Sequence, residues 1–94
     1  MTTIEGTVVR ILSDDTEGDK HQRFIVEKED GRTLLIAHNI DMAPRLFDIN
    51  IGKRITVTGD FEGNEKGGLI HWTHKDPDHE REGGWIDYQG RRFE

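Results

Sequence analysis

The sequence predicts a small all-β protein. Apolar and polar residues alternate in short segments, and clusters of glycine, aspartate and asparagine separate these segments. No long stretch repeats its apolar residues with the 3.6-residue period of a helix. Because alternation with period two is typical of strands that bury one face, we expect a single β-domain over residues 1–94.

Five segments have the alternation and composition of strands: 4–12, 21–29, 32–38, 53–61 and 69–72. Asp30 and Gly31 separate the second and third segments and predict a two-residue hairpin turn, because this dipeptide tolerates positive φ. Residues 39–52 contain Pro44 and too few periodic apolar positions for a full helix, so we expect a short crossover turn. Residues 85–93 predict a small C-terminal hairpin.

Five short strands with a longer connection between the third and the fourth are typical of the oligonucleotide/oligosaccharide-binding (OB) barrel. In such a barrel a small sheet curls nearly closed and so protects its edges. Gly52 before the fourth strand and Gly59 within it suit the bends that this curvature requires. We therefore expect a five-stranded OB-like barrel followed by the C-terminal hairpin.

Composition narrows the function classes. The net charge of −6 opposes long-range attraction to a polyanion, so binding of nucleic acid would require a local basic patch. The absence of cysteine removes disulfides, thiolate metal ligands and a thiol nucleophile. The N-terminal segment does not resemble a secretory signal, and no apolar run is long enough to span a bilayer. We expect a cytoplasmic protein without a membrane partner.

Three segments, HQRF, LLIAHNIDMAPR and GGLIHWTHKDP, resemble an uncharacterised bacterial family of small β-rich domains, known as a domain of unknown function. The resemblance covers most of residues 6–93. It implies no activity and no ligand.

The histidines are the informative residues. A two-residue turn at Asp30 and Gly31 predicts that His38 lies opposite Arg23, with His21 at the same end of the hairpin. If each strand crosses the barrel once, the same end of the barrel also receives His71, His74 and His79. We call this end the histidine pole.

One hypothesis for the histidine pole is a metal site. His71 and His74, with Asp76 or His79, offer imidazole and carboxylate ligands that suit zinc or another divalent transition metal. The alternative is that these imidazoles hydrogen-bond to the backbone and to the acidic loops, which is the commoner fate of a histidine near a strand end.

A second hypothesis is catalysis by a metal- or histidine-dependent phosphodiesterase or nuclease. His38 or His71 would serve as general base, and Arg23 or Arg45 would stabilise an anionic transition state. The chain has no nucleophile elbow, Walker loop or dinucleotide fingerprint.

The leading hypothesis is a small, regulatory binding module for a nucleic acid, a nucleotide or another anionic ligand. Trp72 and Trp85 are candidate stacking platforms, with core filling as their alternative role. The candidate ligand-binding residues are His21, Arg23, His38, Asn39, Arg45, His71, Trp72, His74, Asp76 and Trp85. The expected partners are single-stranded nucleic acid or a nucleotide, and a protein that covers the outward apolar residues Ile25, Leu34 and Ile36.

Overall fold

A computed structural model describes all 94 residues and contains strands but no helix. The strands are β1 (Thr2–Ile11), β2 (His21–Lys28), β3 (Thr33–Asn39), β4 (Arg54–Glu62), β5 (Leu69–His71), β6 (Trp85–Tyr88) and β7 (Arg91–Phe93). The predicted all-β class, the five strands and the C-terminal hairpin are confirmed. No helix of the structure has the length and apolar character needed to cross a membrane.

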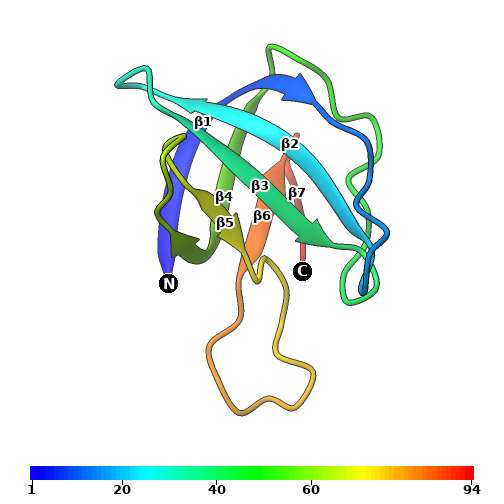
Figure 1. The fold of residues 1–94 in the computed structure, drawn as a ribbon. Coiled ribbons are helices and arrows are strands. Elements are labelled where there is room, and N and C mark those ends of the chain that lie inside the picture. Colours follow the sequence, from blue (N-terminus) through cyan, green and yellow to red (C-terminus); the bar gives the residue numbers. More distant parts are fainter.

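The first five strands close into a barrel (Figure 1). The order around it is β1-β2-β3-β5-β4, and β4 pairs back with β1 from Thr2↔Gly59 to Thr7↔Arg54. All of these pairs are antiparallel except β3 with β5, which is parallel. The remaining hairpin, β6–β7, extends the sheet because β6 pairs with β4.

The β2–β3 hairpin differs from the prediction by one residue of register. Lys28 and Arg32 close the turn through a hydrogen bond of 2.8 Å, so that the loop holds three residues, and Gly31 adopts a φ of 84°. A three-residue loop that ends in the left-handed conformation is a standard hairpin connection. The predicted pairing of His38 with Arg23 is therefore wrong, because His38 pairs with Gln22 and both side chains are buried.

The core is a cluster contributed by all of the strands. It consists of Ile4, Val8, Phe24, Val26, Leu34, Ile36, Leu46, Ile55, Val57, Ile70, Ile86, Tyr88 and Phe93. Leu34 and Ile36, which we expected on the outside, belong to this cluster, and only Ile25 of that trio points away from it. Leu46 enters from the crossover, so residues 40–53 close one end of the barrel without forming a helix.

Two glycines allow strands to approach one another at the bends of the barrel. Gly6 pairs with Lys28 of β2 and with Ile55 of β4, so β1 turns between its two partners at this residue. A Cβ at Gly6 would lie 2.3 Å from the carbonyl oxygen of Glu27, and a Cβ at Gly59 would lie 2.3 Å from that of His71. The expected role of Gly59 at a bend agrees with this contact.

We expect Gly6→Ala and Gly59→Ala each to lower the free energy of unfolding by roughly 2–3 kcal/mol, because backbone must move to admit the methyl group. Gly63→Ala is the matched control, since its Cβ would meet nothing closer than the Phe61 ring at 3.7 Å. Urea denaturation measures all three variants. Equal stability of the Gly6, Gly59 and Gly63 variants would contradict this account of the bends.

Candidate functional site

The strand directions place five strand termini at the histidine pole: the ends of β1, β3 and β5 and the starts of β2 and β4. Three irregular segments cover this end. They are the β1–β2 loop, residues 12–20, the crossover, residues 40–53, and the β5–β6 loop, residues 72–84, which projects from the barrel in Figure 1.

His38 lies inside the pole and is fully buried. Its Nε2 lies 2.8 Å from the carbonyl oxygen of Pro44, and its Nδ1 lies 2.6 Å from Oγ1 of Thr73. A carbonyl oxygen can only accept, so Nε2 donates to Pro44 and Nδ1 accepts from the Thr73 hydroxyl. The neutral imidazole thus joins β3 to the crossover and to the β5–β6 loop.

Burial lowers the pKa of His38 to about 4 from its usual value of 6.5. The hydrogen bond to Pro44 opposes this shift of the pKa, whereas positive charge on His74, His21 and Arg45 adds to it. The ring is therefore neutral at physiological pH, and both nitrogens are occupied inside the protein. His38 is a structural residue in this fold rather than an accessible base.

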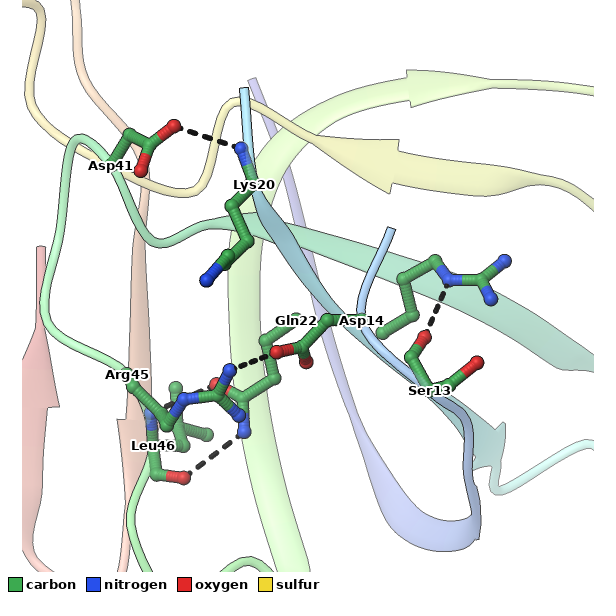
Figure 2. Close-up of polar contacts among 8 residues, drawn as sticks. Ser13, Asp14, Lys20, Gln22, Asp41, Arg45 and Leu46 are labelled. Atoms are coloured by element: carbon green, nitrogen blue, oxygen red, sulfur yellow. Dashed lines mark hydrogen bonds and ion pairs between the residues drawn. The ribbon is translucent and has the colours of Figure 1, made fainter. Parts of the chain in front are cut away.

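Two neighbouring amide side chains hold the crossover in place. Gln22 donates to the carbonyl of Leu46 at 3.0 Å and accepts from its N–H at 2.9 Å, which Figure 2 shows as a pair of contacts. Asn39 accepts from the N–H groups of Asp41 and Met42 through one oxygen and donates to Asp19. Sequence reasoning missed Gln22, whose signal is a polar residue at an inward position of β2.

The rim of the pole is a network in which charged side chains bond to one another and to backbone groups (Figure 2). Arg45 bonds to Asp14, and the carboxylate of Asp41 accepts from the N–H of Lys20 at 2.8 Å. Arg23 donates from Nε to the carbonyl of Ser13 at 3.0 Å and forms no ion pair. His21 donates from Nδ1 to the carbonyl of Asp19 at 2.9 Å. The acidic β1–β2 loop is thereby clamped to the crossover.

Asp76 organises the β5–β6 loop. Its carboxylate accepts from the backbone N–H groups of Asp78, Glu80 and Arg81 at 2.9–3.1 Å. These hydrogen bonds lower the pKa of Asp76, with that from Asp78 contributing most. His74 in the same loop is buried, and its Nδ1 donates to the carbonyl of Lys75 at 2.7 Å.

No group of three or more histidine, aspartate or glutamate side chains is arranged to hold a metal ion. The expected ligands His71, His74 and His79 separate because Trp72 has a φ of 58°, which ends β5 and breaks the alternation of its side chains. His71 lies outside with its Nε2 3.2 Å from Glu62, whereas His74 turns inward. His79 is exposed at the tip of the loop.

Each of the two tryptophan rings is stacked against other side chains of the protein. The guanidinium of Arg81 lies 4.4 Å from the ring centre of Trp72, and the ring of His74 lies 4.6 Å from it. Arg92 covers Trp85 in the same way at 4.6 Å. Arg81 is itself held by both carboxylate oxygens of Asp60. Trp72 thus has two stacking partners within the chain, and Trp85 has one.

A partly enclosed groove of about 330 Å³ lies on the outer face of β2 and β3. The β1–β2 loop borders it through Leu12, and the β4–β5 loop, residues 63–68, borders it on another side. Ile25 and Leu35, which pair across the two strands, form its apolar floor. The lining residues are Leu12, Ile25, Thr33, Leu34, Leu35, Asn64, Lys66 and Gly68.

Residues 2–94 match the family model described as protein of unknown function (DUF3465). The chain belongs to this family. The expected resemblance to a family without an assigned function is thereby confirmed. Neither a search of curated proteins nor a search of solved structures gives a match. Membership in DUF3465 supplies no activity, and the groove and the histidine pole are the two candidate sites of the chain.

The lowered pKa of His38 makes stability depend on pH. Because the pKa is lower in the folded protein, the unfolded chain binds more protons between pH 4 and pH 6.5. The stabilisation that neutral His38 contributes should therefore be complete above pH 6.5. As the pH decreases toward 4, the free energy of unfolding should fall by a total of about 3 kcal/mol. Urea denaturation across this range measures the slope.

His38→Gln is the control, because glutamine does not titrate in this range. The variant should be less stable at neutral pH by roughly 2–4 kcal/mol, since it disturbs two buried hydrogen bonds. The slope between pH 4 and pH 6.5 should largely disappear in it. If wild type and variant have parallel stability profiles, His38 is not the group responsible. If His38→Gln folds poorly, NMR titration of the His38 imidazole in the wild-type protein tests the same lowered pKa directly.

Proposed function

We propose that this protein is an OB-fold binding module that recognises single-stranded nucleic acid on the outer face of β2 and β3. The strand order β1-β2-β3-β5-β4, closed by β1 with β4 and containing one parallel pair, supports the OB assignment. In OB folds the face of strands two and three and the loops after strands one and four bind oligonucleotides and oligosaccharides. Because a fold alone does not determine function, the groove carries the proposal.

The groove has the chemistry of a site for an anionic chain. Its floor of Ile25 and Leu35, together with Leu12 at its border, offers apolar surface against which bases and sugars can lie. Lys66 at the β4–β5 loop and Arg23, two residues from Ile25 on the outward side of β2, form no ion pair with any carboxylate. These two cations are free to contact phosphates, which supply most of the affinity in such complexes.

The groove is favoured over the histidine pole as the binding site. At the pole, His38 and His74 are buried and hydrogen-bonded, and Arg45 is paired with Asp14. The same hydrogen bonds disfavour a phosphodiesterase site at the pole, because both ring nitrogens of His38 are occupied and neither can contact a substrate. The net charge of −6 implies modest affinity that decreases steeply with salt.

The proposal predicts that a fluorescein-labelled oligothymidylate of about ten nucleotides binds with micromolar affinity at low salt. Fluorescence anisotropy measures the affinity, and NMR shift changes should cluster at Ile25, Leu35 and Lys66. Lys66→Glu and Arg23→Glu should each weaken binding by about tenfold, because each replaces a phosphate-facing cation with an anion.

Lys53→Glu is the matched control, since it makes the same charge change at an exposed position of the crossover, away from the groove. It should reduce affinity far less than Lys66→Glu. Equal effects of the three substitutions would indicate non-specific attraction, and shift changes confined to the pole would move the site there. Cleavage of the oligonucleotide, followed by gel electrophoresis, would favour the phosphodiesterase.

A further inference from the structure

β7 is the one strand of the sheet with a single neighbour. Closure of β1 onto β4 gives every other strand two or more partners, whereas β7 pairs with β6 alone. No hydrogen bond from the irregular segments or from any side chain reaches the backbone of residues 91–93. One edge of β7 is therefore open to another chain, and an unpaired edge is a template for strand addition.

The hairpin geometry identifies the open groups. Gln89 and Gly90 both have positive φ, at 52° and 76°, which is the signature of a type I′ turn. In such a hairpin Tyr88 and Arg91 form the hydrogen-bonded pair next to the turn, and Asp87 and Arg92 form the following non-hydrogen-bonded pair. The N–H and C=O of Arg92 consequently point away from β6.

A groove of about 190 Å³ adjoins this edge. It is lined by Phe47, Asp48, Tyr88, Gln89, Arg91 and Phe93. Phe47 is 62% exposed, which is unusual for an aromatic side chain of this size. Arg91 lies 5.0 Å from the ring centre of Phe93 and forms no ion pair, so its charge is available.

We propose that β7 is a docking edge for an extended segment of a partner protein, which pairs antiparallel with β7 around Arg92. In an antiparallel pair, the N–H and C=O of one residue both bond to the residue directly opposite it. The outward N–H and C=O of Arg92 would bond in this way to one residue of the segment. The neighbouring side chains of the segment then face Phe93 and Arg91. The segment carries an apolar residue for the Phe47–Phe93 groove and, two residues toward its C-terminus, one acidic residue for Arg91.

A second copy of this chain does not suit the edge. Antiparallel pairing of two β7 strands around Arg92 would place the two Arg92 side chains directly opposite each other, and like charges in that position are destabilising. A stable dimer also buries about 800 Å² on each partner, which a three-residue edge does not provide.

The charge of the groove limits the charge of the segment. Asp48, which lines the groove beside β7, disfavours a segment with several carboxylates.

The test uses a heptapeptide of threonine that carries isoleucine at its third position and glutamate at its fifth. Added at millimolar concentration to ¹⁵N-labelled protein, it should shift the amide signals of Phe47, Asp48 and β7. Replacement of the peptide glutamate by lysine should weaken binding by about tenfold, and Arg91→Glu should reverse that preference.

Arg92 supplies a matched pair of variants. Arg92→Ala removes the ion pair with Asp87 and the stacking on Trp85 but keeps the outward N–H, so binding should persist. Arg92→Pro removes the N–H as well, at an edge position that tolerates proline, and should weaken binding by about tenfold or more. Where the proline variant loses its dispersed NMR spectrum, N-methylation of the central peptide residue replaces it and should have the same effect.

Three results would overturn the proposal: no shift of β7 signals at millimolar peptide, equal binding of the glutamate and lysine peptides, or equal binding by Arg92→Ala and Arg92→Pro. Sedimentation that shows self-association of wild type, lost in Arg92→Pro, would assign the edge to a second copy instead. The nucleic-acid groove lies on β2 and β3, so the result does not depend on the proposed function.

Discussion

The neutral imidazole of His38 is the interaction on which the closed end of this barrel depends. It contacts Pro44 of the crossover and Thr73 of the β5–β6 loop, two segments that share no strand pairing with each other. An ion in the same place would have to be desolvated beside other positive groups, and a purely apolar side chain would leave the Pro44 carbonyl without a donor. Histidine in its neutral form satisfies both requirements.

The other polar residues inside the pole follow from the same constraint. Irregular segments that close a barrel bring backbone groups into the interior without strand partners, and those groups must be hydrogen-bonded. Gln22 satisfies both backbone groups of Leu46, which is the crossover residue that enters the core. Asp76 does the same for the β5–β6 loop at three amides. Most of the residues that we expected to bind a ligand at the pole therefore stabilise it.

The sequence predicted the barrel well because strand alternation and turn composition are local properties. It failed on the register of the β2–β3 hairpin, because a Glu29-Asp30-Gly31 loop and an Asp30-Gly31 turn differ by one residue and have the same composition signal. This shift of one residue places Gln22, instead of Arg23, opposite His38. The proposed metal ligands do not form a group in the structure, because the left-handed backbone of Trp72 is a tertiary feature that alternation does not reveal. The groove depends on two loops that are distant in sequence, and of its two floor residues only Ile25 was expected to face outward.

The closure of β1 onto β4 has a kinetic consequence. It joins residues such as Thr3 and Thr58, which are 55 positions apart, whereas the β2–β3 hairpin joins close neighbours. Loop-closure entropy must be overcome before distant strands gain any contact, so chains dominated by such pairings fold in milliseconds to seconds rather than microseconds. We therefore expect the pairing of β1 with β4 to be the slow step of folding, and until it forms one edge of β1 is exposed.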